Sequence, residues 1–228
     1  MTNEDLKLLI DKANNNDELI HLRPLSETVY FAKFWLEKPC ATDNIIYNDR
    51  FHKSYFIKNT DRLFVAIVYV MGEQDLHVYV LEEHRKQGYL TKAMKEVILF
   101  HLFKSREEQQ ITIQKKRMPE KDYEASKKVA LSLGFKLLKN ETYSLSKEEY
   151  QVDDLVFEKN MGITLERINE LQKQINYLSK SLSMIQIEIE MKLGKTEYTD
   201  ELEELVEEIF NHTWKLEDFY FKSRRNNS

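Results

Sequence analysis

One stretch of the chain, residues 77–91, reads HVYVLEEHRKQGYLT and combines a strand-like start, a polar loop with one glycine, and a helix-like end. The N-terminus of a helix presents unpaired backbone N–H groups and a partial positive charge, so it attracts anions. Gly88 would let a ligand approach the backbone closely, and Arg85 and Lys86 add positive charge. The stretch therefore predicts a phosphate-binding loop, and a solvated basic helix start is the alternative interpretation.

The strand before the loop carries side chains that could transfer a proton. Alternation along residues 76–81 places His77, Tyr79 and Leu81 on one face. A histidine has a reference pKa of about 6.5 and can accept a proton near neutral pH. Glu83 and the neighbouring Glu82 are further candidates. The alternatives are an ordinary hydrogen-bonded strand histidine and solvated loop acids.

These residues must be positioned by regular elements, which hydrophobic periodicity and turn residues locate. The 63–70 and 76–81 segments, separated by a short turn, predict a β-hairpin. The pattern predicts an α+β fold, with a central mixed β-sheet flanked by helices. The expected helices span residues 4–13, 27–37, 88–104 and 120–133, and the expected strands span 19–22, 53–57, 63–70, 76–81, 111–113, 135–138 and 155–159.

The loop resembles motif A of the GNAT-type N-acetyltransferase superfamily, in which a strand leads into Arg/Gln-x-x-Gly-x-Gly/Ala. Residues 85–90 read RKQGYL here. The family's motif B has the form N-x-x-S, followed by an aliphatic residue and Gly-Phe. Residues 123–126 read YEAS and lead, with the same spacing, to LGF at 133–135. The order of elements is also similar, and the resemblance covers roughly residues 19–160.

The resemblance implies acetyl-CoA as the co-substrate and a primary amine as the acceptor, which attacks the thioester directly. It implies that loop amides bind the pyrophosphate and that the preceding strand polarises the thioester carbonyl. We expect His77, Tyr79 and Glu83, which lie near the thioester in this scheme, to be the catalytic candidates. Tyr123 is our hypothesis for the general acid, and its alternative role is that of an aromatic residue at a helix start that packs on the fold. The implied cofactor-binding residues are Val80, Leu81, Arg85, Lys86, Gln87, Gly88, Tyr89, Leu90, Thr91 and Ser126.

Three positions depart from the family's pattern. Leu90 replaces the last small residue of the loop, Tyr123 replaces the usual asparagine, and Ala130 stands where many members carry a tyrosine. These departures keep two alternatives open. One is a catalytically inactive scaffold or assembly protein that works through its C-terminal helices, and the other is a regulator that senses acyl-CoA.

The chain after residue 162 has a different character, so we expect an acyltransferase-like domain over 1–162 and a helical coiled-coil module over 163–228. A heptad seam steps by three and four residues through Ile168, Leu171, Ile175, Leu178, Leu182, Ile185 and Ile189. A second helix is expected from Asp200, which lies at capping-box spacing from Glu203. We expect a homo-oligomer through residues 163–220, because a two-helix hairpin with a narrow seam buries little by itself.

Composition excludes several classes of protein. The chain has 228 residues, a net charge of −5 and one cysteine, Cys40, so it forms no internal disulfide, and no Cys/His spacing predicts a metal site. It shows no basic stripe or helix-turn-helix, so direct nucleic-acid binding is not expected. The longest apolar run, residues 65–71, is too short to cross a membrane, and the start lacks a signal-peptide pattern. We expect a cytoplasmic protein.

Overall fold

The computed structural model describes residues 1–43, 51–72, 74–150 and 161–225. The chain divides into two compact units, Met1–Met161 and Gly162–Ser228.

The first unit mixes helices and strands, which confirms the predicted α+β class. Its elements, in chain order, are α1 (Asn3–Asn14), β1 (Ile20–Pro24), β2 (Val29–Phe34), β3 (His52–Lys58), β4 (Phe64–Met71), β5 (Asp75–Val80), η1 (Glu82–His84), α2 (Tyr89–Ala93), η2 (Met94–Ile98), α3 (Leu99–Phe103), β6 (Glu108–Thr112), η3 (Lys115–Arg117), α4 (Glu120–Ser132), β7 (Lys136–Lys139), β8 (Thr142–Ser146) and η4 (Lys147–Glu149).

The strands form two antiparallel sheets rather than the single mixed sheet that the sequence predicted. One sheet has five strands in the order β1-β2-β3-β4-β5, and the other has three in the order β6-β8-β7. The predicted β4–β5 hairpin is confirmed, with Ala66 opposite Val80. The sheets meet where the Gln110 N–H donates to the Gln74 carbonyl, at 3.0 Å.

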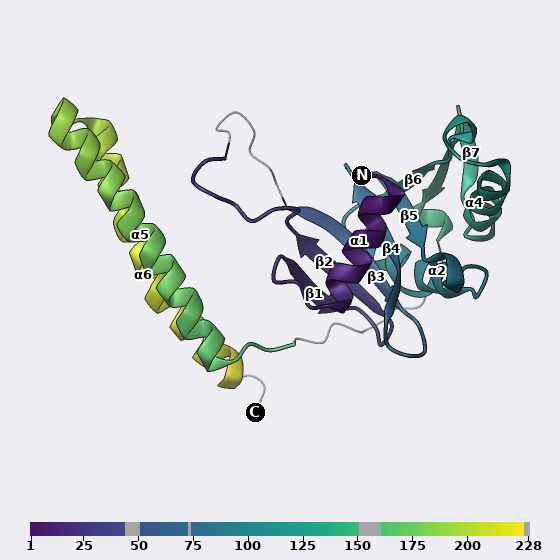
Figure 1. Cartoon of the computed structure of the whole chain (residues 1–228), viewed down its shortest axis with the longest axis horizontal. Helices are drawn as coiled ribbons and strands as arrows, with labels where there is room; N and C mark the ends of the chain where they lie inside the picture. The colour runs from purple at the N-terminus through teal and green to yellow at the C-terminus, as the bar shows by residue number, and fades with distance from the viewer. Residues whose placement is uncertain (44–50, 73, 151–160, 226–228) are drawn as a thin grey trace. The chain divides into compact units, whose positions relative to one another are not determined.

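Helices cover both faces of the five-stranded sheet. Helix α1 lies across one face (Figure 1), where Leu6 and Ile10 pack against Phe34 and Ile67. The helical segment α2–η2–α3 packs on the other face, and its buried side chains join those of β3 and β4 in one cluster. Consecutive residues of the central strands therefore face two different apolar layers.

One predicted helix is wrong. Residues 27–37 were expected to be helical, but Val29–Phe34 forms strand β2 and pairs with both β1 and β3. The predicted 135–138 strand corresponds to β7. The sequence did not predict β8, which lies in what looked like a polar connection. The predicted 155–159 strand lies outside the described residues.

The second unit is a pair of long helices that lie side by side, α5 (Leu165–Leu193) and α6 (Glu197–Arg225) (Figure 1). Hydrogen bonds join Gln172 to the Thr213 carbonyl and Ser179 to the Val206 carbonyl, so the helices are antiparallel. Helix α6 begins three residues before the predicted Asp200, because the Thr196 hydroxyl accepts the Thr199 N–H at 3.3 Å.

The predicted seam is only partly the contact between these helices. Leu178 and Ile185 are 57% and 52% exposed, whereas the neighbouring Ser179 and Gln186 are 4% and 7% exposed. The apolar stripe is therefore turned toward one side of the contact with α6. Among the described residues, no helix is both long enough and apolar enough to cross a membrane.

Candidate functional site

Strand β5 lies at the edge of its sheet, and its free side faces β6. The Leu81 N–H donates to the Val65 carbonyl of β4 at 2.9 Å. Hydrogen bonds alternate from side to side along an antiparallel strand, so the N–H groups of Val78 and Val80 point away from β4. In the described part of the chain, Gln110 to Gln74 is the one backbone hydrogen bond that joins β6 to the β4–β5 hairpin.

Side chains take the place of the next backbone hydrogen bonds between β5 and β6. Asp75 Oδ1 accepts the N–H of Leu76 at 2.8 Å and the N–H of Thr112 at 3.0 Å. Gln109 Nε2 donates to the carbonyls of Gln74 and Gln110. Because these backbone groups are already satisfied, the two strands are paired at the start of β5 and not beyond it. Within the described residues, no hydrogen bond joins β5 to β6 beyond Asp75.

The predicted loop follows directly after Val80 and turns sharply twice. A single 3-10 turn, η1, leads to Lys86 at φ 64° and Gly88 at φ 83°, both in the left-handed region. Gly88 is the N-cap of α2, and a Cβ added there would meet open space. Glycine adopts this conformation without strain. The loop therefore brings a bare stretch of backbone to the start of the helix.

The first turn of this helix leaves its N–H groups available. Within the described residues, the N–H groups of Gln87, Gly88, Tyr89, Leu90 and Thr91 have no hydrogen-bond acceptor. Tyr89 and Leu90 are half-buried and pack against the core, so their side chains anchor the helix start. The helix then contains one π turn, η2, a feature that is frequent at functional sites.

Arg85 folds back toward the strand. Its Nε donates to the Val80 carbonyl at 3.2 Å, one of its terminal nitrogens lies 3.9 Å from the Glu82 carboxylate, and its guanidinium lies 6.0 Å from the Tyr79 ring centre. Lys86 and Glu83 are exposed, and the Glu83 carbonyl accepts a hydrogen bond from Gln87 at 3.0 Å. Of the charged side chains in the loop, Arg85 is thus the one that contacts β5.

His77 and Tyr79 lie on the face of β5 that α1 covers. His77 Nε2 lies 3.0 Å from Asn3 Oδ1 of α1. Burial lowers the pKa of His77 below its usual value, and the positive charge of the N-terminus lowers it further. The side chain is therefore neutral near pH 7. Val80 belongs to the opposite layer, so His77 and the Val80 side chain lie on different faces.

Tyr123 lies against the second sheet. Its ring is 5.6 Å from Lys115 Nζ. Burial raises the pKa of Tyr143, a residue of β8, and a hydrogen bond with Tyr123 raises it further. Ser126 is half-buried on α4, and Ala130 is buried in the core that the two sheets share. The structure thus does not bring Tyr123 and His77 to one layer.

Asp75 and Gln109, whose side chains replace backbone hydrogen bonds between the strands, were not selected from the sequence. An aspartate at a turn and a glutamine in a strand are ordinary residues, and their role depends on which strands become neighbours. Among the described residues, no group of acidic, histidine or cysteine side chains could hold a metal ion. Comparisons of the chain with protein-family models, curated proteins and solved structures give no match.

Proposed function

We propose that residues 19–160 bind acetyl-CoA and transfer its acetyl group to a primary amine, as the resemblance to GNAT-type N-acetyltransferases implies. One observation carries the proposal. After Asp75, strand β5 makes no hydrogen bond to β6 among the described residues, and the strand leads into a loop whose glycine opens the N-terminus of a helix. The strand has free backbone groups, and about seven residues later the helix start can bind an anion. Together they suit a long ligand that carries a diphosphate.

The diphosphate of the cofactor would lie at the helix start. Five consecutive N–H groups, from Gln87 to Thr91, are available there, and the helix dipole adds partial positive charge. Open space beside Gly88 leaves room for a phosphate close to the backbone. Lys86 is exposed next to these amides and would add a full positive charge.

The thioester would lie farther back, along the free edge of β5. The Val80 N–H points toward this edge and would donate a hydrogen bond to the thioester carbonyl, stabilising the oxyanion. The amine nitrogen attacks the carbonyl carbon, the C–S bond breaks, and CoA leaves as a thiolate. The amine must lose a proton, for which His77 and Glu83 are the candidates, acting directly or through water.

The thiolate must then gain a proton. Tyr123 contacts Lys115 and Tyr143, which are not residues of β5 or of the loop. We therefore propose that the thiolate is protonated by solvent. Loss of turnover in a Tyr123→Phe variant would instead restore the general-acid role.

Calorimetric titration of acetyl-CoA into the full chain tests the binding step. We expect Gly88→Asp to abolish binding, because the new carboxylate would occupy the space beside the amides and repel phosphate. Gly72→Asp is the matched control, since Gly72 also has a positive φ, of 59°, and an added Cβ there also meets open space. Equal loss in both variants, or no binding to the wild type at millimolar cofactor, would refute the proposal.

A thiol-release assay with a panel of amines tests the transfer step separately. Release that depends on both acetyl-CoA and an amine is the expected result. Tight binding without any release would refute transfer and favour the acyl-CoA-sensing alternative, whereas absence of binding would favour the scaffold alternative.

A further inference from the structure

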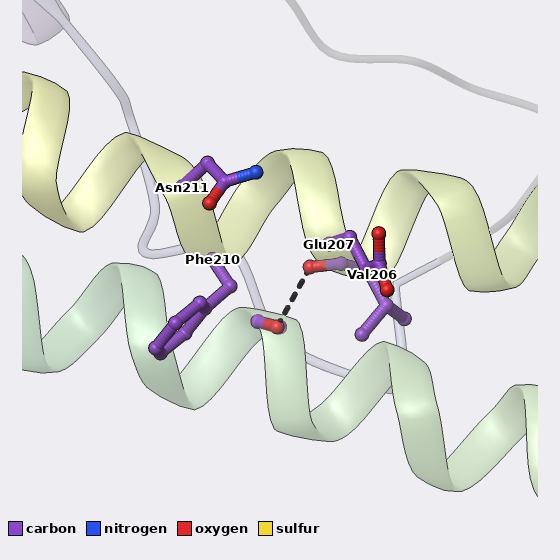
Figure 2. Close-up of a pocket in the computed structure, with 5 residues that line it drawn as sticks. Val206, Glu207, Phe210 and Asn211 are labelled. Atoms are coloured by element: carbon purple, nitrogen blue, oxygen red, sulfur yellow. Dashed lines mark hydrogen bonds between the residues drawn. The ribbon is translucent and has the colours of Figure 1, made fainter.

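The contact between α5 and α6 is unusually polar for two helices of this length. In a heptad lettered a to g, the positions that face the other helix are a and d. Position a of α5 is occupied by Gln172, Ser179 and Gln186, with Leu165 and Leu193 at the two ends of the helix. The first two bond to carbonyls of α6, both at 2.9 Å. Figure 2 shows the Ser179 bond in a hollow that Val206, Phe210 and their neighbours line.

The larger apolar residues lie at d and at the flanking position g. Leu171, Leu178 and Ile185 occupy position g of α5, and Leu178 and Ile185 are exposed. Position g of α6 is occupied by Tyr198, Leu205, His212 and Phe219. Of these, Tyr198, Leu205 and Phe219 are exposed.

Both sets of g residues lie on the same face of the hairpin. In an antiparallel helix pair, the g positions of the two helices lie on one side of the contact and the e positions lie on the other. The e side is different, because α5 contributes only polar residues there. These residues are Asn169, Asn176, Ser183 and Glu190. The g side is therefore the face on which both helices are apolar, and we call it the g face.

We propose that the g face binds the same face of a second copy of this chain, so that two hairpins form an antiparallel four-helix bundle. Apolar residues at a and d alone suit a two-helix seam, whereas a third apolar position suits a helix that faces two neighbours. Here positions d and g are mostly apolar in both helices; the exceptions are Lys192, His212 and Ser223. The three interior a positions of α5 are polar. Part of the apolar surface of each helix therefore lies outside the contact between α5 and α6.

Charge patterns identify a second copy as the partner that fits. Position c borders the g face on the outside of each helix. In α6 it is occupied successively by Glu201, Glu208, Lys215 and Lys222. If two α6 helices lie antiparallel, Glu201 lies beside Lys222 of the second copy and Glu208 lies beside its Lys215. The same four residues thus form opposite-charge pairs with themselves, as a two-fold interface requires.

Helix α5 carries two charged residues at position c, Arg167 near its start and Glu188 near its end. The α6 pairs fix the two-fold axis at the level between Asn211 and His212. Because Ser179 meets Val206, the same level on α5 falls between Lys173 and Gln174, so the axis does not pair Arg167 with Glu188 of the second copy.

Hairpins with their tips together would instead set α5 against α6 of the second copy. The hydrogen bond between Ser179 and Val206 fixes how far α5 and α6 are shifted along each other. With the tips together, Glu188 would lie near the acidic start of α6 of the second copy, and Arg167 would lie near the basic end of that helix. Like charges disfavour this arrangement.

The mass of the full chain in solution, measured by light scattering after gel filtration, tests the interface. We expect twice the chain mass of 27.4 kDa for the wild type, and 27.4 kDa for the double variant Leu178→Asp/Ile185→Asp. Tyr177→Asp/Met184→Asp is the matched control. Its residues lie one position earlier in the heptad, point away from α6, and are 71% and 73% exposed. A monomeric wild type, or equal dissociation of both double variants, would overturn the proposal.

Charge variants keep the test independent of any loss of helix in the aspartate variants. Lys215→Glu/Lys222→Glu should weaken the dimer, and adding Glu201→Lys/Glu208→Lys to the same chain should restore it. Circular dichroism of each variant checks that the helices are intact. A dimer insensitive to both pairs, or weakening without restoration, would overturn the antiparallel arrangement.

A distance measurement decides between the two orientations directly. A spin label at Glu197→Cys, in a Cys40→Ser background, marks the tip of each hairpin. Helix α6 has 29 residues, so labels at opposite ends of an antiparallel pair would lie ~43 Å apart at 1.5 Å per residue. Tips that lie together would give about 20 Å or less, as expected from interhelical spacings. The short distance would refute our model. Both results are independent of whether the first unit binds acetyl-CoA.

Discussion

Replacement of Asp75 by alanine should destabilise the first unit and impair cofactor binding at the same time. Its carboxylate accepts two backbone N–H groups, from Leu76 and Thr112, which belong to different sheets. A hydrogen bond to a charged group contributes roughly 1.5–3 kcal/mol when buried. Asp75 is half-buried, so we expect Asp75→Ala to lower the free energy of unfolding by about 2 kcal/mol in total. Asp75→Asn keeps the accepting oxygen and should cost roughly half as much.

The loss of Asp75 also frees the two N–H groups to pair with carbonyls of the opposite strand. The strands would then be expected to pair further along β5, which would cover the free N–H of Val80. We therefore expect the affinity of Asp75→Ala for acetyl-CoA to fall more than the affinity of Asp75→Asn, in a titration well below the unfolding temperature.

Urea unfolding measures the stability effect. The chain has two tryptophans, one in each unit, so a Trp214→Phe background leaves Trp35 as the reporter of the first unit. Asp11→Ala is the matched control, because Asp11 is an exposed residue of α1, and its loss should change stability by less than about 0.5 kcal/mol. If Asp75→Ala is as stable as this control, Asp75 does not hold the two sheets, and our explanation of why the pairing of β5 and β6 ends there is wrong.

Three further predictions concern other residues. Burial lowers the pKa of His77, so the folded state binds a proton at this side chain less readily than the unfolded state. The contribution of His77 to the free energy of unfolding should therefore be complete above pH 6.5 and decrease as the pH falls below that value. In urea titrations at several pH values, His77→Gln should reduce this dependence on pH. Tyr123→Phe should keep turnover within about twofold in the thiol-release assay, whereas a general acid would contribute roughly 100-fold or more. Thr196→Ala removes the cap of α6 and should lower hairpin stability by about 1 kcal/mol, measured by thermal melting at 222 nm, the wavelength of the helix signal.

The elements of the first unit were predictable where a clear period or bounding turn residues mark them. The helix over 88–104 and the β4–β5 hairpin have clear periods and turn residues, and both are present. Residues 27–37 failed for a specific reason. In β2, Val29 and Phe31 join one apolar layer while Ala32 and Phe34 join the other. A strand buried on both faces is apolar at nearly every position, so its spacing also satisfies a helical pattern.

The candidate site was predictable as a loop but not as a strand edge whose hydrogen bonds to its neighbour end at Asp75. Gly88 at positive φ and the helix start after it follow from local sequence, because one residue type and one helical period are enough to indicate them. The point at which β5 and β6 stop pairing depends on residues 75 and 109, which are far apart in the chain. Propensities and periodicities within short stretches of sequence cannot predict that these two side chains lie between the same two strands. The same limit applies to His77, whose partner Asn3 lies 74 residues away.

The helical unit shows how a correct periodicity can still leave the packing undetermined. A heptad stripe gives the direction in which a helix is apolar, but it does not state which neighbour lies in that direction. Here Leu178 and Ile185 of the stripe are exposed beside the contact with α6, whereas Ser179 and Gln186 are buried, as is Ile168 of the same stripe. Burial of serine and glutamine in place of leucine and isoleucine would be unfavourable for an isolated hairpin. It becomes favourable if each helix has a second neighbour on its apolar side. The charges along α6 are complementary to those of an antiparallel second α6, so a second copy of the chain can be that neighbour. The exposure of Leu178 and Ile185 beside a polar contact is therefore the physical reason to expect a second copy.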